Sequence, residues 1–271
     1  MTPANAANNS SANVDADVLL REFQDGICTL TLNRPGQRNA LSLNLINALI
    51  RELDDIAQDT AIRVVILAGA GPVFSSGHDL REIRDNPSEQ FYRQLFDNCS
   101  SLMMKIITLP QPVIARVHGP ASAAGCQLVA TCDLAVATNT ATFATPGVNI
   151  GLFCSTPMVA LSRNVGRKHA MRMLLSGEPV SATRAQEMGL VSDVTEEENL
   201  DVACVELARL IASKSRQAVK IGKEAFYRQL ELGIKEAYEF AGDVMTVNMS
   251  KEDAAEGIGA FLDKRDPQWK E

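Results

Sequence analysis

Two loops carry the strongest pattern in this sequence, and they read FSSGHDL at residues 74–80 and GPASAAGCQ at residues 119–127. Each loop follows a short apolar strand, consists mainly of Gly, Ala and Ser, and leads into a helix. Small residues let a ligand approach the backbone closely, and the first turn of a helix leaves N–H groups without partners. The two loops could therefore direct one N–H group each at the same developing oxyanion. Small residues in such loops could also serve tight packing alone.

Apolar strands alternate with helices in the part of the chain that surrounds these loops. The pattern predicts a hairpin from Val18 to Asn33 and buried strands at 64–67, 113–117 and 134–137. A helix capped by Ser42 and a longer one from about Ser88 to Ile107 fit between them. This rhythm indicates an α/β fold.

The rhythm changes in the last third of the chain, where helical patterns dominate apart from one short strand near residues 190–194. The first sixteen residues are rich in Ala, Asn and Ser and contain no Lys or Arg. We therefore expect a disordered tail at 1–16, a core at 17–198 and a helical C-terminal region at 199–271.

Beyond the two loops, further short segments follow in a recognisable order. Together they resemble the crotonase (enoyl-CoA hydratase/isomerase) superfamily over residues 18–268, and the run FATPGVN at 143–149 is similar to the enoyl-CoA hydratase domain-containing protein 3 group. The matching segments are LNRP at 32–35, NAL at 39–41, residues 74–80, AAGCQL at 123–128, CDLA at 132–135, Phe143, Gly151, Gly177-Glu178, Glu256-Gly257, Phe261 and Lys264-Arg265.

The resemblance implies a crotonase (ClpP-like) fold, which is a repeated ββα superhelix with a helical C-terminal part that builds a homotrimer or a dimer of trimers. It implies an acyl-CoA substrate whose thioester carbonyl is held by the backbone N–H groups of His78 and Ala124. Coenzyme A is then part of the substrate, with no metal and no permanently bound cofactor. The residues implied to contact it are Arg38, Ala40, Leu41, Ser76, Gly77, His78, Asp79, Leu80, Arg81 and Gly125, with Arg34 as a further phosphate candidate.

The sequence departs from the hydratase pattern at both proton-transfer positions. Gln127 and Gly147 stand where hydratases of this family have glutamates. Glutamine can orient water but cannot exchange a proton at neutral pH, and glycine has no side chain. Each general acid or base is worth roughly 10²–10⁴-fold in rate, so we expect weak hydratase turnover.

Other groups could replace the missing acids. Ser155 stands where some family members place an acid, but it could also cap the following helix. Cys154 is a conceivable nucleophile or a buried inert thiol. The His78 ring could act as an acid or base, or the residue could contribute only its N–H. Asp79 is expected to cap the helix after its loop, and His118 to support the second loop.

Three functions remain open on these residues. The first is an enoyl-CoA hydratase/isomerase-type enzyme, and the second is a decarboxylase of malonyl-type CoA esters, which needs no base at the α carbon. The third is a non-catalytic acyl-CoA binder or a regulatory subunit of a mixed trimer. Neither GxGxxG after the first strand nor GxxxxGK[ST] is present, which argues against a nucleotide cofactor.

Composition restricts the partners and the compartment. The net charge of −7 argues against nucleic acid, and no stretch is long and apolar enough to cross a membrane. The six cysteines are irregularly spaced and the three histidines scattered, so we expect reduced thiols and no metal site. Since the first residues fit neither a secretory signal nor an Arg-containing mitochondrial presequence, we expect a cytoplasmic protein.

Overall fold

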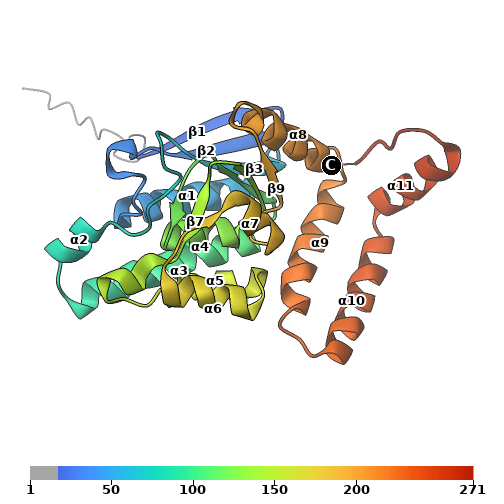
Figure 1. The fold of residues 1–271 in the computed structure, drawn as a ribbon. Coiled ribbons are helices and arrows are strands. Elements are labelled where there is room, and N and C mark those ends of the chain that lie inside the picture. Colours follow the sequence, from blue (N-terminus) through green and yellow to red (C-terminus); the bar gives the residue numbers. More distant parts are fainter. Residues whose placement is uncertain (1–17, 271) are drawn as a thin grey trace, which may run out of the picture.

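The computed structural model describes residues 18–270, so the tail predicted at 1–16 lies outside the described residues. A six-stranded sheet runs through the body of the molecule in the order β1-β2-β3-β4-β6-β9, with β1 antiparallel to β2 and the others parallel (Figure 1). Its strands are β1 (Leu19–Gln24), β2 (Ile27–Leu32), β3 (Val64–Gly69), β4 (Val113–Val117), β6 (Leu134–Thr138) and β9 (Asp193–Thr195).

Helices cover both faces of this sheet, which explains why β3 reads as a continuous apolar run. Val65 and Leu67 belong to a large cluster with α1 (Leu43–Gln58), α3 (Glu89–Thr108) and α4 (Ala124–Thr131). Val64 and Ile66 pack on the opposite side with Cys204 of α8 (Leu200–Ala212). Fully burying one such aliphatic side chain stabilises the fold by roughly 1.5–3 kcal/mol.

Side-chain caps fix where the helices of the body begin. The Ser42 hydroxyl accepts from the Leu45 N–H, as the sequence predicted. The Ser88 hydroxyl accepts from the Phe91 N–H at the predicted start of the longer helix. Asp79 accepts from the N–H groups of Arg81 and Glu82 and begins the short helix α2 (Leu80–Asp85). The caps at Asp79 and Ser88 thereby set both ends of the segment that joins the first loop to α3.

A second, three-stranded sheet was not predicted from the sequence, because its strands are only two or three residues long. It has the order β5-β7-β8 and lies next to the second loop. Its strands are β5 (Ala121–Ser122), β7 (Thr142–Ala144) and β8 (Val180–Ser181). The remaining short elements of the body are η1 (Pro35–Gln37), η2 (Pro146–Ile150), η3 (Glu197–Asn199), α5 (Pro157–Asn164), α6 (Arg167–Ser176) and α7 (Ala182–Glu187).

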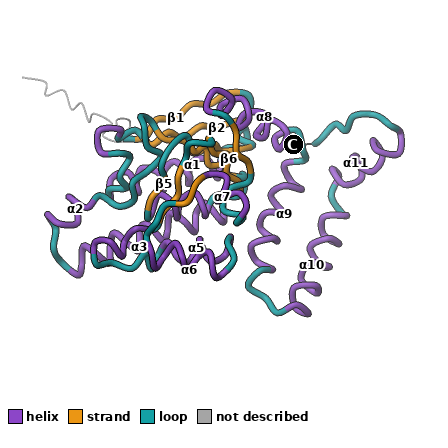
Figure 2. Tube along the Cα trace, in the orientation of Figure 1, coloured by secondary structure: helices purple, strands orange, loops and turns teal. Residues whose placement is uncertain are grey.

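The helices α9 (Arg216–Gln229), α10 (Ile234–Met249) and α11 (Glu252–Asp263) form an arm that stands apart from the body (Figure 1). Figure 2 shows strands only in the body, whereas the arm contains helices and loops alone. Neither α9 nor α10 has a buried residue, and large apolar side chains such as Ile234, Tyr238 and Phe261 are exposed. The fold therefore agrees with the α/β class and the helical C-terminal part expected from the sequence.

A buried ion pair attaches the arm to the body. The Lys223 ammonium on α9 lies 2.7 Å from the Asp133 carboxylate and donates to the Ile106 and Gln111 carbonyls. The Tyr227 hydroxyl donates to the other Asp133 oxygen. Burial lowers the pKa of Lys223, and the Asp133 carboxylate opposes that shift. With all its polar atoms paired, this cluster fixes how α9 leaves the body.

Candidate functional site

The two loops lie directly against each other. Ser122 donates its N–H to the Ser75 carbonyl at 2.9 Å, and a β-bridge joins Ser75 to Ala121. A Cβ placed on Gly77 would lie 2.9 Å from Ala123 Cβ and 3.2 Å from the Ala124 nitrogen. Gly77 also has a φ of +91°, a conformation that glycine adopts without strain. The absence of a side chain at residue 77 is therefore what lets the first loop reach the start of α4.

The contact brings together two N–H groups that lack acceptors. Leu41 donates to the Gly77 carbonyl and Asp79 donates to the Leu41 carbonyl, so the His78 N–H between them stays free. Ala124 is the first residue of α4, where no intrahelical acceptor exists. Neither N–H has a hydrogen-bond partner among residues 18–270. The arrangement resembles an oxyanion hole built from two backbone donors.

A strained residue holds the second donor in place. Ala123 has φ 50° and ψ −116°, a region that side-chain-bearing residues rarely occupy. Its N–H donates to the Ala144 carbonyl at 2.9 Å, and its carbonyl accepts from the Gln127 N–H at 3.0 Å. These two bonds fix the direction in which the Ala124 N–H points.

The segment at residues 39–41 lies beside the first loop, and Asn39 has a structural role there that was not predicted. The Asn39 amide is fully buried, and its nitrogen donates to the Ala70 and Val73 carbonyls. The Ser75 hydroxyl donates to the Asn39 carbonyl. The available signal in the sequence was the asparagine itself, because asparagine tolerates a positive φ, here 50°, better than most residues.

The basic residues near these segments divide into two groups. Arg34 pairs with Asp79 at 2.9 Å and also donates to the Ala40 carbonyl. Its side chain therefore stabilises the fold by joining these two segments. Arg38 and Arg81 are exposed, and no carboxylate within the described residues pairs with either side chain. These two arginines are therefore available to a phosphate, while Arg34 is not.

Asp79 is held in its charged form. Burial alone would raise the pKa of its carboxyl group, but the hydrogen bonds from Arg34 and from the N–H groups of Glu82 and Arg81 lower the pKa below its usual value. The predicted capping role agrees with this geometry.

The remaining expected contact residues lie around the same two loops. Ser76 donates its N–H to the Arg38 carbonyl at 3.0 Å, and Leu41 is bridged to His78. Leu80 begins α2 with half of its surface exposed. A side chain on Gly125 would collide with the Ser75 carbonyl, so that glycine is needed for the close approach of the loops.

The His78 ring turns away from polar partners. It packs edge-on against Phe96 of α3 with ring centroids 5.4 Å apart, and both ring nitrogens are buried without hydrogen bonds. Burial lowers the pKa of His78, although the Leu41 backbone opposes the shift, so the ring stays neutral at pH 7. His118 differs, because its Nε2 lies 2.6 Å from the Gly71 carbonyl oxygen, as expected for a residue that supports the second loop.

The two residues expected to replace the family's glutamates, Gln127 and Gly147, are both buried. Gln127 is 4% exposed on the first turn of α4, and its Oε1 has no donor. At Gly147 an added Cβ would lie 2.7 Å from the Leu152 carbonyl oxygen and 2.9 Å from Cys154 Sγ. The space of a side chain at residue 147 is thus already filled by the following loop.

Cys154, and not Ser155, faces Gly147. Burial raises the pKa of the Cys154 thiol, although the Gly147 backbone opposes the shift, so the thiol stays protonated at neutral pH. Ser155 is exposed and its hydroxyl contacts only the Phe153 carbonyl at 3.4 Å. No base among residues 18–270 contacts it, and the N-terminus of α5 has no side-chain cap, so the expected alternative role as a cap is wrong.

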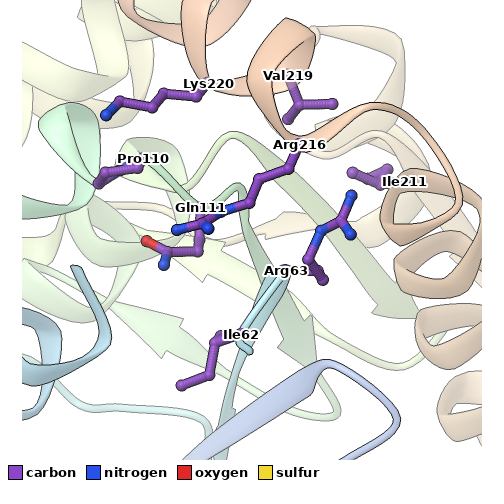
Figure 3. Close-up of a pocket in the computed structure, with 8 residues that line it drawn as sticks. All are labelled: Ile62, Arg63, Pro110, Gln111, Ile211, Arg216, Val219 and Lys220. Carbon is purple, nitrogen blue, oxygen red and sulfur yellow. The ribbon is translucent and has the colours of Figure 1, made fainter. Parts of the chain in front are cut away.

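A surface cavity elsewhere does not belong to this site. It lies where α8 passes into α9 and is lined by Arg63, Gln111 and Arg216, among others (Figure 3). None of the predicted site residues lines it. Residues 18–270 contain no group of His, Cys, Asp and Glu that could hold a metal ion, and none of their helices is long and apolar enough to span a membrane.

Comparison with known proteins identifies the family. The enoyl-CoA hydratase/isomerase family model matches residues 22–271. Enoyl-CoA hydratase domain-containing protein 3, mitochondrial, from Mus musculus is 48% identical over 246 residues, which cover 91% of this chain and 82% of the relative. The structure of an enoyl-CoA hydratase from Mycobacterium smegmatis superposes with a TM-score of 0.91 at 52% identity, covering 93% of this chain and 98% of the other.

The human enoyl-CoA hydratase domain-containing protein 3 structure also superposes with a TM-score of 0.91, at 46% identity and with 93% of this chain and 100% of the other covered. The resemblance to that group is confirmed. The expected cytoplasmic location is wrong, because relatives from mouse, rat, zebrafish and human are named mitochondrial proteins. That expectation rested on the composition of the first sixteen residues, which the structure does not describe. The chain belongs to the enoyl-CoA hydratase/isomerase family.

Proposed function

We propose that this protein binds an acyl-CoA thioester and polarises its carbonyl with the backbone N–H groups of His78 and Ala124. The single observation that supports this most strongly is the contact of Gly77 with the start of α4, which brings two N–H groups without acceptors together. A thioester carbonyl oxygen gains negative charge when an enolate or a tetrahedral species forms. Donors fixed in advance stabilise that charge, and losing one typically costs about 10²–10³-fold in rate.

The CoA moiety would lie along residues 38–41 and 76–81. Arg38 and Arg81 can meet its phosphates, because both side chains are exposed and neither pairs with a carboxylate among the described residues. Ala40, Leu41, Ser76, Leu80 and Gly125 surround the two donors and would contact the pantetheine part through backbone and apolar groups. No further cofactor is needed for this chemistry.

The same site should hydrate enoyl-CoA esters weakly. Hydration adds a water oxygen to the β carbon and a proton to the α carbon, and Gln127 cannot supply or accept that proton. Gly147 offers no side chain, and Leu152 and Cys154 fill the adjacent space. Family membership therefore supports a nominal hydratase or isomerase, with turnover limited by the missing acids.

We further propose that the chain assembles through its arm as a trimer or a dimer of trimers. The exposed apolar side chains of α9, α10 and α11 support this assembly, since an apolar surface of this kind is seldom left in water.

The test compares crotonyl-CoA hydration by the wild-type protein and by Gln127→Glu, with Gln217→Glu on the exposed face of α9 as the matched control. Very low wild-type turnover that rises at least about tenfold only in Gln127→Glu is expected, since one positioned acid is typically worth 10²–10⁴-fold. Rapid wild-type hydration would contradict the assignment of a site that lacks proton-transfer groups.

Decarboxylation of a malonyl-type CoA ester is the second candidate. In that reaction the bond from the α carbon to the carboxylate breaks, CO₂ leaves, and the electron pair becomes the enolate, which water then protonates. No base is needed at the α carbon, and this fits a site in which residue 147 cannot present one. Release of CO₂ from malonyl-CoA or methylmalonyl-CoA by a protein that does not hydrate crotonyl-CoA would favour this reaction.

A non-catalytic binder would behave differently from both enzymes. It would bind CoA esters without releasing CO₂ and without exchanging α-deuterium for solvent protons.

A further inference from the structure

The surface cavity at the α8–α9 junction is a separate place where a ligand can bind (Figure 3). Gln111 lines it from the body of the molecule, while Arg216 and Lys220 line it from the first two turns of α9. No acidic side chain lines it, although the whole chain carries a net charge of −7. The cavity is therefore a local concentration of positive charge on an acidic protein.

Two cations of this cavity have no partner of opposite charge. Neither Arg216 nor Lys220 pairs with a carboxylate within residues 18–270. Both lie near the N-terminal end of α9, where the helix dipole adds a partial positive charge. Arg63 also lines the cavity, but its guanidinium already donates to the Lys214 carbonyl. Arg216 and Lys220 are therefore available to an anion.

A buried amide oxygen in the same cavity lacks a partner. Gln111 is 3% exposed, and its Oε1 has no hydrogen bond in the part of the chain that the structure describes. Its Nε2 donates to the Ile56 carbonyl at 2.7 Å and to the Asp59 carbonyl at 3.3 Å, which fixes the amide so that Oε1 faces elsewhere. A buried acceptor without a donor is unfavourable. Since Arg216 extends from α9 toward Gln111 (Figure 3), a ligand beside Arg216 can supply that donor.

The cations and the amide oxygen together define the ligand. Arg216 and Lys220 favour negatively charged oxygens, whereas Gln111 Oε1 only accepts and needs an O–H or N–H group. Phosphate at neutral pH is an anion that keeps at least one O–H group. Sulfate has the same shape but keeps no proton, so it would leave the Gln111 oxygen without a donor. Because the cavity is small, it suits a compact ion of this kind better than a whole cofactor.

We propose that this cavity binds inorganic phosphate, with Arg216 and Lys220 binding its charged oxygens and Gln111 accepting its O–H hydrogen. The ion would join the body, to which Gln111 belongs, to the arm that begins with α9. It would do so beside an existing attachment, because the Lys223 ammonium of α9 donates to the Gln111 carbonyl at 3.0 Å. None of the residues assigned to the acyl-CoA site lines the cavity, so the inference does not depend on the proposed function.

The test is a calorimetric titration of the full-length protein with inorganic phosphate and with sulfate, at pH 7 and constant ionic strength. Phosphate should bind at one site per chain and about tenfold more tightly than sulfate, because sulfate leaves the buried Gln111 oxygen unpaired. Phosphate should also raise the thermal unfolding temperature of the wild type more than sulfate does, since a ligand that binds only the folded state stabilises it.

Two double variants separate this site from general attraction of anions to surface cations. Arg216→Gln with Lys220→Gln should weaken phosphate binding by about tenfold or more, because it removes the hydrogen bonds from both charged groups. The matched control is Arg167→Gln with Lys168→Gln, which removes two exposed charges from the start of α6, outside the cavity. That control should keep the phosphate affinity of the wild type.

A third variant tests the role of the amide oxygen. Gln111→Met keeps both cations but removes the acceptor, so the preference for phosphate over sulfate should disappear, even though the variant also loses the Nε2 bonds that stabilise the fold. Absence of phosphate binding, equal affinity of the wild type for phosphate and sulfate, or an unchanged phosphate affinity after replacement of Arg216 and Lys220 would each overturn the proposal.

Discussion

The two sides of the α4 N-terminus differ in how they are built. On the donor side, the His78 and Ala124 N–H groups are held by backbone bonds and by the absence of a side chain at Gly77. On the acid side, proton transfer in a hydratase would depend on side chains, and the resemblance to the family implies that Gln127 and Gly147 occupy those two positions. A fold preserves its backbone donors through many contacts, whereas one substitution removes a side-chain acid. Membership of the family therefore supports the presence of the two backbone donors, but it does not specify which reaction they serve.

The largest effect on the donor side is expected from Gly77→Ala in the Gln127→Glu background. The new Cβ meets Ala123 Cβ at 2.9 Å and the Ser122 carbonyl oxygen at 3.0 Å, so the loops must separate. We expect crotonyl-CoA hydration to fall by about 10²–10³-fold, as for the loss of one oxyanion donor. Steady-state kinetics measure the loss. Gly36→Ala is the control because nothing lies within 4 Å of its Cβ, and equal activity of the two variants would refute the role of Gly77.

Restoring an acid at residue 127 should raise activity, whereas disturbing the backbone donors lowers it. Gln127→Glu in the wild-type background should raise crotonyl-CoA hydration by about tenfold, below the 10²–10⁴-fold of a complete acid–base site because residue 147 still contributes nothing. A pH–rate profile should show one ionisation that the wild type lacks. An increase without any new ionisation would mean that the glutamate acts only through packing.

Residue 147 should not respond to the same replacement. Gly147→Glu forces the side chain against the Leu152 carbonyl and Cys154 Sγ, so we expect no gain in hydration and a loss of about 1–3 kcal/mol in unfolding free energy, as for other overpacked sites. Chemical denaturation measures the loss. Gly242→Ala, whose Cβ would have open space, should not destabilise. A stable, active Gly147→Glu variant would contradict this expectation, because it would show that the loop containing Leu152 and Cys154 can move to make room for the side chain.

His78→Phe should have the smallest effect, because only the backbone of residue 78 belongs to the donor side. Hydration by the Gln127→Glu protein should change less than about threefold, well below the effect of a general acid or base. Burial lowers the pKa of His78 in the folded state, so the unfolded chain takes up the proton first as pH falls below 6.5. Wild-type stability should then decrease between pH 6.5 and 5 more steeply than that of His78→Phe, and denaturation at several pH values measures the difference.

The sequence predicted the parts of the molecule that depend on local patterns. The apolar run at Val64–Leu67, the caps at Ser42 and Asp79, and the pairing of the two loops all agree with the structure. Such features follow from periodicity and from residues adjacent in the chain.

The parts that depend on distant contacts could not be predicted. Arg34 looked like a phosphate ligand until the structure paired it with Asp79, 45 positions away. Cys154 fills the space at Gly147 only because the loop after η2 folds back. No spacing rule in the sequence encodes these relations.

The most direct test of the central claim is the infrared spectrum of butyryl-CoA, labelled with ¹³C at its thioester carbonyl and bound to the wild-type protein. The account predicts a carbonyl stretch shifted to lower frequency than in water, although the same protein barely hydrates crotonyl-CoA. The shift should disappear in Gly77→Ala and persist in Gly36→Ala. A bound carbonyl with the frequency of the free ester would contradict the claim that two backbone N–H groups polarise it.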